Sequence, residues 1–390
     1  MTEGQGRARR VPALIIASFF FVFMGPAVVQ IYLRNLMRPE EGRMSATTVL
    51  AALYFSFMLW RLLTVKSQHV FGDKWSLVFG LAAYLLIPVA LAFTTNYVVL
   101  LVMAVLWGWG AAGIWLTGPV WLYDNTDPRR RGLWAGVLYM TLFGGLWLGT
   151  LLVGFAAKTE NRALMLAILI APGALAVALA AALPSRRARA EGITFAAVRR
   201  VFFDLKVIIL GSLLFVAATT YGFLLGAFRD GIDDAYGTAA VGTVLSFFFA
   251  ARLVVSILGG HFSDVFARKS VIALVFFVGG AGLATASASQ SVWAFSLGAI
   301  ALAVVGGTVP VSATAYSADW FAPERRALAM GAAFFWQDAG TALALLAGQY
   351  VARTSSSVAA PFLVFAALFL ASAFLALFIP EMQRAPEEVI

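Results

Sequence analysis

The sequence predicts an all-α membrane protein with twelve transmembrane helices arranged in two pseudo-symmetric bundles of six. Three observations lead to this prediction. The 390 residues are 62% hydrophobic and only 12% charged, which is about half the charged share of an average soluble domain. Apolar runs long enough to cross about 30 Å of hydrocarbon recur along the whole chain. The two halves of the sequence also repeat the same short motifs, as transporters built from internal repeats do.

The composition excludes most enzyme chemistry. The chain contains no cysteine and two histidines, so we expect no metal site and no cofactor. It contains no glycine-rich phosphate-binding loop followed by lysine, which excludes a pump that hydrolyses ATP within this chain. We therefore expect a protein that is not an enzyme.

Short polar breaks separate the apolar runs, and each run is expected to form one helix. The first run is expected to be retained, because its apolar stretch is too long for a signal peptide and no small-residue cleavage site follows it. The expected spans are 11–33, 46–66, 75–94, 96–122, 133–156, 163–183, 207–228, 238–260, 270–288, 291–317, 328–352 and 357–379.

The longest polar break, residues 185–206, separates six spans from six and predicts the domain boundary. We expect one bundle over residues 1–184 and a second over residues 207–390. Within the break, apolar side chains between Phe195 and Leu205 share one helical face beside two arginines. This pattern indicates a short helix lying on the membrane surface, although a plain linker is the alternative.

The basic residues predict the orientation. Twelve spans place both termini on one side, and most of the 28 lysines and arginines fall on that side, including Arg268 and Lys269. Basic loops stay in the cytoplasm, so we expect cytoplasmic termini in a bacterial-type inner (plasma) membrane. Orientation also accounts for the formal charge of +9 without a nucleic-acid partner. We expect a monomer surrounded by lipid.

Two alignments connect the halves. Residues 122–136 align with residues 317–331, which places Asp124 over Asp319. Earlier in each half the offset is 191 residues, and it pairs Arg61 with Arg252. A change of four residues in one loop reconciles the two offsets. Two related bundles can exchange inward-open and outward-open states around a site between them.

The loop between the eighth and ninth spans, GGHFSDVFARK, resembles the Gly-x-x-x-Asp-Arg-x-Gly-Arg-Lys loop of the major facilitator superfamily. The copy between the second and third spans, HVFGDKWSL, keeps fewer of these residues. In the loop between the eighth and ninth spans the matching positions are Gly260, Asp264, Arg268 and Lys269. In the loop between the second and third spans they are Asp73 and Lys74. With the repeated PxRR and PERR loops, the resemblance extends over essentially the whole chain.

This resemblance implies a gate at the cytoplasmic ends of the helices. A carboxylate there can face the positive N-terminal end of a helix in the other half, together with arginines nearby. The implied pairs are Asp73 with Arg325 and Arg326, and Asp264 with Arg130 and Arg131. They would hold the cytoplasmic side shut in the outward-facing state. Ordinary cap and topology charges are the alternative.

Three charged side chains lie deep in the expected helices: Arg61, Arg252 and Asp338. Such groups are costly at the bilayer centre unless they face protein or water, so each is a candidate functional residue. The two arginines precede the gate aspartates by twelve residues and so lie about 18 Å deeper. Two guanidiniums from related helices can clamp an anionic substrate. A structural ion pair between Asp338 and one arginine is the alternative.

Asp338 is the only deep carboxylate and the candidate proton-coupling site. Substrate that competes for an arginine could switch the protonation of Asp338, and Gln337 could help to orient it. We expect a secondary active transporter of a small anionic or zwitterionic organic solute, coupled to protons or to exchange. The alternatives are a proton-driven exporter of drugs or amphiphiles from the same superfamily and a membrane receptor without transport.

Overall fold

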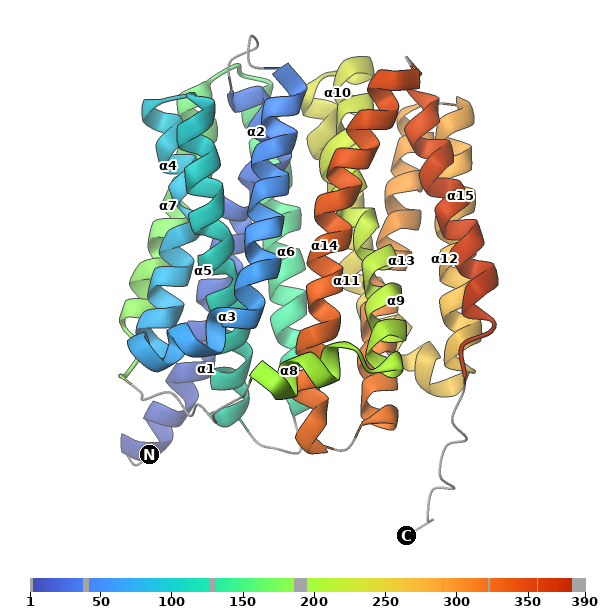
Figure 1. Cartoon of the computed structure of the whole chain (residues 1–390). Coiled ribbons are helices and arrows are strands. Elements are labelled where there is room, and N and C mark those ends of the chain that lie inside the picture. The colour runs from blue at the N-terminus through green and yellow to red at the C-terminus, as the bar shows by residue number, and fades with distance from the viewer. Residues whose placement is uncertain are drawn as a thin grey trace.

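The computed structural model describes residues 3–37, 42–126, 131–185, 195–289, 291–321, 323–355 and 357–380. Within these ranges the chain forms helices and no strand. We call the helices before residue 185 the N-terminal half and those after residue 204 the C-terminal half. In Figure 1 the two halves stand side by side as long bundles.

The N-terminal half begins with a broken helix and continues with long ones. Its elements are α1 (Glu3–Met24), α2 (Val29–Leu36), α3 (Gly42–Tyr84), α4 (Leu86–Phe93), α5 (Tyr97–Asp124), α6 (Arg131–Ala157) and α7 (Arg162–Ala181). Between α1 and α2 stands a 3-10 turn, Pro26–Val28. Gly25 precedes this turn and lies so close to α7 that an added Cβ would be 2.9 Å from the carbonyl oxygen of Leu169.

The C-terminal half follows a short helix, α8 (Phe195–Phe202). Its elements are α9 (Leu205–Phe223), α10 (Arg229–Tyr236), α11 (Thr238–Val265), α12 (Arg268–Ser289), α13 (Val292–Trp320), α14 (Pro323–Ser355) and α15 (Ala359–Ala376). A π-helical turn, Leu224–Phe228, joins α9 to α10.

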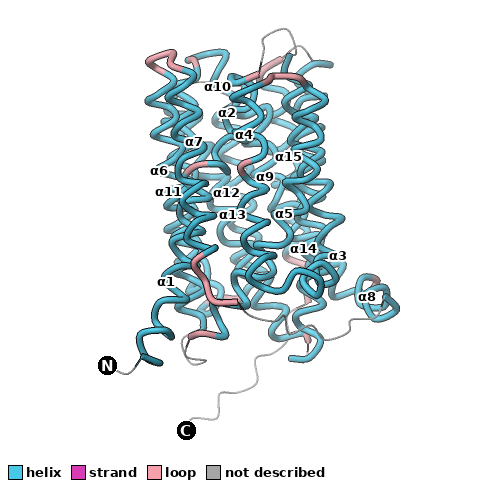
Figure 2. Tube along the Cα trace, turned by 90° about the vertical axis from the view of Figure 1, so that its left-hand side faces the viewer, coloured by secondary structure: helices cyan, strands magenta, loops and turns pink. Residues whose placement is uncertain are grey.

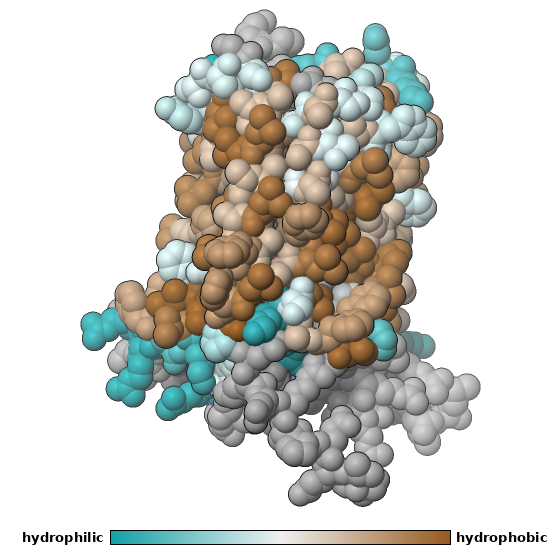
Figure 3. Space-filling view, turned by 90° about the vertical axis from the view of Figure 1, so that its right-hand side faces the viewer, coloured by the Kyte–Doolittle hydropathy of each residue, from teal (hydrophilic) through white to brown (hydrophobic). Residues whose placement is uncertain are grey.

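Ten helical segments of the described chain are long and apolar enough to cross a membrane. The other two expected spans, 46–66 and 328–352, are also helical and lie within α3 and α14. Figure 3 shows the side that carries α12 and α15, where apolar side chains form a band and hydrophilic ones gather toward the ends. Exposed apolar residues on these two helices include Leu274, Phe277, Leu363 and Phe374. The chain is therefore an integral membrane protein.

Three boundaries differ from the sequence prediction. The expected first span, 11–33, is broken at Gly25 and continues to Leu36. The expected break between the second and third spans is a kink and not a longer loop: two helices meet within α3 at Gly72, whose φ of 71° and ψ of 169° suit glycine. The expected span 207–228 ends too early, since α10 extends the helix to Tyr236.

Helices α3 and α6 of the N-terminal half pack against α14 and α11 of the C-terminal half, respectively. Figures 1 and 2 place α8 across the end where α1 begins, which we call the near end, and α2 and α10 at the opposite, far end. The ring of Phe202 on α8 stacks on Trp336 of α14 with centroids 5.5 Å apart. The surface helix expected in the central break is thus present and rests on the C-terminal half.

Candidate functional site

Arg61, the expected midplane arginine of the N-terminal half, contacts Asp338 of the C-terminal half. Arg61 on α3 donates from Nε to Oδ2 of Asp338 on α14, and its Nη2 lies 3.4 Å from Oδ1. The side chain of Asp338 is 3% exposed and that of Arg61 is 18% exposed. The forked contact crosses from one half to the other, so this ion pair is broken if α3 and α14 separate.

Two phenyl rings flank the same guanidinium. The Cζ of Arg61 lies 4.3 Å from the ring centroid of Phe57, one turn earlier on α3, and 5.3 Å from that of Phe334 on α14. Guanidinium groups are attracted to aromatic faces at these distances. The guanidinium of Arg61 therefore has two aromatic partners in addition to the carboxylate of Asp338.

The midplane arginine of the C-terminal half has no carboxylate partner. The Cζ of Arg252 on α11 lies 4.7 Å from the ring centroid of Phe143 on α6 and 5.7 Å from that of Phe248. Its Nε is buried and makes no hydrogen bond. Within the described chain no carboxylate oxygen lies within 4 Å of this guanidinium. Among the described residues, the partners found for the Arg252 guanidinium are therefore aromatic faces and not a carboxylate.

The structure places Gln337 beside Asp338 on α14 without bringing the two side chains together. Within the described residues, the contact recorded for Gln337 is its carbonyl oxygen, which accepts from Thr341 at 3.4 Å. The expected orienting role of Gln337 therefore has no counterpart in this conformation.

One face of α6 has free space beside it at the near end and lies in close contact with α11 at the far end. Gly136, Phe143 and Gly154 share this face, because residues seven or eleven apart differ by about 20° around a helix. A Cβ on Gly136 would have no atom within 4 Å, whereas one on Gly154 would lie 2.9 Å from the Cα of Gly242 on α11. The interface between α6 and α11 is thus open at the near end and closed at the far end, with Arg252 between.

The matching face of α14 repeats this gradient. Gly331, Asp338 and Gln349 share it, and a Cβ on Gly331 would also meet no atom within 4 Å. Asp338 follows with its contact to Arg61, and Gln349 donates to Oδ2 of Asp230 at 2.5 Å near the far end. Along the described part of α14, contact with the other half is therefore present at the level of Asp338, and Gln349 reaches the far-end charges through Asp230, whereas the position of Gly331 is open.

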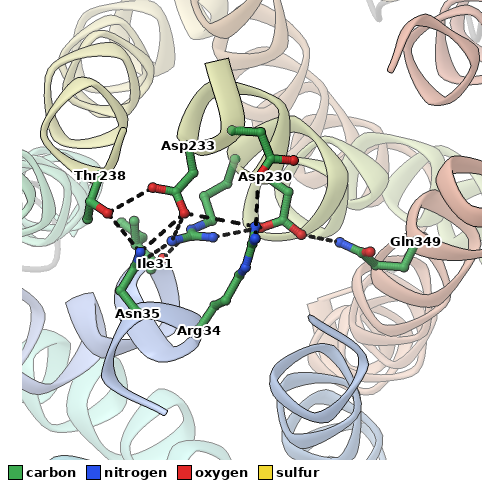
Figure 4. A network of polar contacts seen from close by, with 9 residues as sticks. Ile31, Arg34, Asn35, Asp230, Asp233, Thr238 and Gln349 are labelled. Atoms are coloured by element: carbon green, nitrogen blue, oxygen red, sulfur yellow. Dashed lines mark hydrogen bonds and ion pairs between the residues drawn. The ribbon is translucent and has the colours of Figure 1, made fainter. Parts of the chain in front are cut away.

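A network of charged side chains closes the far end, as Figure 4 shows. Arg229, at the start of α10, is 1% exposed. It donates to the carbonyl oxygen of Ile31 at 2.9 Å, to Asp230 at 2.6 Å and to Oδ1 of Asn35, and it lies 3.2 Å from Asp233. One buried arginine thus joins α10 to α2 of the other half.

Arg34 adds a second cation to this far-end network. Its Nη1 lies 2.8 Å from Oδ1 of Asp230 and its Nη2 lies 3.3 Å from Asp234. Asn35 donates to Asp233 at 3.1 Å and to the hydroxyl of Thr238 at 2.8 Å. Asp230 therefore accepts from both arginines and from α14, which makes it the centre of the closure.

The residues of the expected cytoplasmic gate lie at the near end, and the pairs remain a prediction. Asp73 is 7% exposed, and Arg325 is exposed. Lys74 lies 5.7 Å from the ring of Trp75, and Arg268 lies 5.7 Å from that of Tyr316. Lys269 begins α12 with Arg268. The side chains of Asp264, Arg131 and Arg326, and the whole of Arg130, fall outside the described residues.

The sequence analysis missed the far-end network. The expected first and seventh spans end at residues 33 and 228, which leaves Arg34 and Arg229 outside the expected helices. A usable signal was present in the segment RDGIDDAY that directly follows an apolar run. Its acidic residues recur at helical spacing, which predicts one charged face on a continuing helix.

Comparison with known families agrees with this architecture. The family model of the Major Facilitator Superfamily matches residues 210–389. A second model, described as ion channel regulatory protein UNC-93, matches residues 42–224. No curated protein matches the chain.

Proposed function

The chain belongs to the major facilitator superfamily, and we propose that this membrane transporter moves a small anionic or zwitterionic organic solute by alternating access. The observation that carries the proposal is Arg252, a guanidinium between the two halves with a buried Nε that lacks a hydrogen-bond acceptor. A buried N–H that has lost water without gaining an acceptor is costly. A negatively charged solute would supply the missing acceptor at the depth where this architecture binds substrate.

The open and closed ends support alternating access. In our proposal residues 1–184 and 207–390 form two six-helix bundles, with twelve spans in total, that rock about the 185–206 linker. The far-end network and the Gly154–Gly242 contact hold one side shut. With the termini in the cytoplasm of a bacterial-type inner membrane, this is the inward-facing conformation of a monomer.

The Arg61–Asp338 pair suggests how transport is driven. In one version Asp338 takes up a proton when the pair separates, which couples solute movement to a pH gradient. In the other version the pair only neutralises charge, and the transporter exchanges one solute for another. Both versions need Asp338 near the binding site, and the ion pair across α3 and α14 is consistent with either.

The test begins with a screen for ligands that raise the unfolding temperature of the purified protein, because a ligand of the folded state stabilises it. Acids, amino acids, sugars and cationic dyes are screened, and each positive compound is followed into reconstituted vesicles. We expect counterflow of an acid or amino acid, and loss of that flux in Arg252→Gln. The control is Arg353→Gln, which removes the same charge from an exposed position on α14.

Two results would contradict the proposal. Counterflow of uncharged amphiphiles that persists in both Arg61→Gln and Arg252→Gln would favour the drug or amphiphile exporter. Ligand binding without flux of any solute would favour a second candidate, a regulatory membrane protein without transport. The match of residues 42–224 to the UNC-93 model favours that candidate.

A further inference from the structure

The repeat relates the surroundings of the two arginines as well as the arginines themselves. Arg61 and Arg252 are 191 residues apart, and so are Phe57 and Phe248, which lie one turn before them and face their guanidiniums. Each arginine thus has the same partner from its own helix.

The partners from the opposite half differ at two related positions, where Tyr139 corresponds to Phe334 and Phe143 to Asp338, and only the second changes the charge. Helices α6 and α14 are related by the second offset, 195 residues, which places Phe143 over Asp338. Asp338 binds Arg61, whereas Phe143 presents its ring to Arg252. The site therefore contains one ion pair, between Arg61 and Asp338. At the position related by the repeat, the ring of Phe143 stands in place of the carboxylate.

This asymmetry determines the charge of the ligand. Two guanidiniums and one carboxylate leave a single positive charge, on Arg252. One anionic group would neutralise it, whereas a second would lie unpaired in a low-dielectric site, which is unfavourable. An ammonium group would have no acceptor either, because Asp338 is occupied by Arg61. The surroundings of Arg252 thus favour a monoanion over a dianion or a zwitterion.

The rings around Arg252 indicate the body of the ligand. Tyr139 stacks on Phe143 with centroids 6.2 Å apart, and Tyr221 stacks on Phe248 at 6.4 Å. Tyr139 is 41% exposed and lies near Phe143 on the face of α6 that opens at the near end. Aromatic walls on both sides of one cation suit an apolar, preferably planar, group attached to the anion.

We propose that Arg252 binds the single carboxylate of a monoanionic solute with an aromatic or apolar body, and that this carboxylate gives Arg252 the charged acceptor that Asp338 gives Arg61. The inference rests on the proposed transport function and narrows its substrate to monocarboxylates.

The experiment measures thermal unfolding of the purified full-length protein with four probes that share a phenyl group. They are 3-phenylpropionate, a monoanion; benzylsuccinate, a dianion; phenylalanine, a zwitterion; and phenethylamine, a cation. We expect 3-phenylpropionate to raise the unfolding temperature most and Arg252→Gln to weaken its binding at least tenfold. Equal stabilisation by the dianion or the zwitterion, or no response to 3-phenylpropionate at millimolar concentration, would overturn the inference.

A second pair of variants changes Phe143, the residue at the position related to Asp338. These variants keep the inference testable if Arg252→Gln does not fold. Phe143→Asp places a carboxylate at the position related to Asp338. It should raise the unfolding temperature without ligand and abolish the response to 3-phenylpropionate. Phe143→Leu removes the ring without adding charge and should keep most of the response. Unchanged ligand response in Phe143→Asp would contradict the inference.

Different results would refute the transport function and the ligand class. If 3-phenylpropionate binds through Arg252 but crosses reconstituted vesicles no faster than in empty vesicles, the transport function is wrong and the ligand class stands. If a solute is transported and Arg252→Gln transports it unchanged, the ligand class is wrong and transport stands.

Discussion

Replacing Arg34 by glutamine is expected to loosen the far end without unfolding either half. The substitution removes a contact of 2.8 Å to Asp230 and one of 3.3 Å to Asp234. Asp230 keeps Arg229 at 2.6 Å and Gln349 at 2.5 Å. No buried carboxylate is therefore left without a partner, and the full penalty of a broken buried pair does not apply.

The expected magnitude follows from the burial of each contact. A hydrogen bond between charged groups contributes about 1.5–3 kcal/mol, and the side chain of Arg34 is 25% exposed, which favours the lower part of that range. The contact to Asp234, whose side chain is 37% exposed, adds at most about 1 kcal/mol. Closure should weaken by about 2 kcal/mol, and 1.4 kcal/mol is tenfold in an equilibrium constant, so the open population should rise roughly 30-fold.

The assay measures the distance between spin labels at Lys158, which follows α6 at the far end, and at Ala235 on α10, both of which are exposed and outside the network. In Arg34→Gln a population with a longer separation at the far end should appear. Arg162→Gln is the matched control, because Arg162 donates to the carbonyl oxygen of Leu91 at 2.7 Å within the N-terminal half alone. The same distance distribution in both variants would refute the reasoning.

Four further substitutions test other contacts. Arg229→Gln should lower the free energy of unfolding by about 2–3 kcal/mol, because its buried hydrogen bonds to Ile31 and Asp230 are lost while Asp230 keeps Arg34 and Gln349; thermal unfolding like that of the native protein would contradict this. Asp338→Asn should cost about 3–5 kcal/mol by leaving Arg61 unpaired, and adding Arg61→Gln should restore stability; a double variant no more stable than Asp338→Asn would show that the pair is not the cause. If Asp338 carries the proton, its Asn variant should lose uptake driven by a pH gradient yet keep counterflow in vesicles, and full uphill uptake would eliminate it as the coupling site. Gly154→Leu should hold the far end apart, because a Cβ there already lies 2.9 Å from the backbone of α11; cross-linking of α6 to α11 as efficient as in the native protein would argue otherwise. Asp264→Asn should shift the resting population toward inward-open, and an unchanged spin-label distance across the near end would reduce Asp264 to a topology charge.

Hydropathy predicted the position of most helices because each apolar run must be helical in lipid. It failed where a helix continues into polar residues. The seventh span was ended at residue 228, yet α10 continues to Tyr236 after the π-helical turn at Leu224–Phe228. The helix can carry Arg229 and Asp230 there because protein, and not lipid, surrounds them.

The depth of the three midplane charges was predicted from spacing alone, but their partners were not. Spacing along a helix determines height and face, so Arg61, Arg252 and Asp338 could be assigned to one level. Asp338 could equally have paired with either arginine. The packing of α3 against α14, and of α6 against α11, decides that Arg61 receives the carboxylate and Arg252 receives Phe143.

The sequence by itself determined the membrane class, the repeat and the family, and it predicted which charged residues share one level, because these depend on composition and on periodicity along the chain. Only the tertiary structure decided which end is closed, which arginine is paired, and that Arg34 and Arg229 meet one aspartate nearly two hundred positions from Arg34. The physical reason is that contacts between the halves join residues distant in sequence. No local pattern encodes which of several similar charges will face each other.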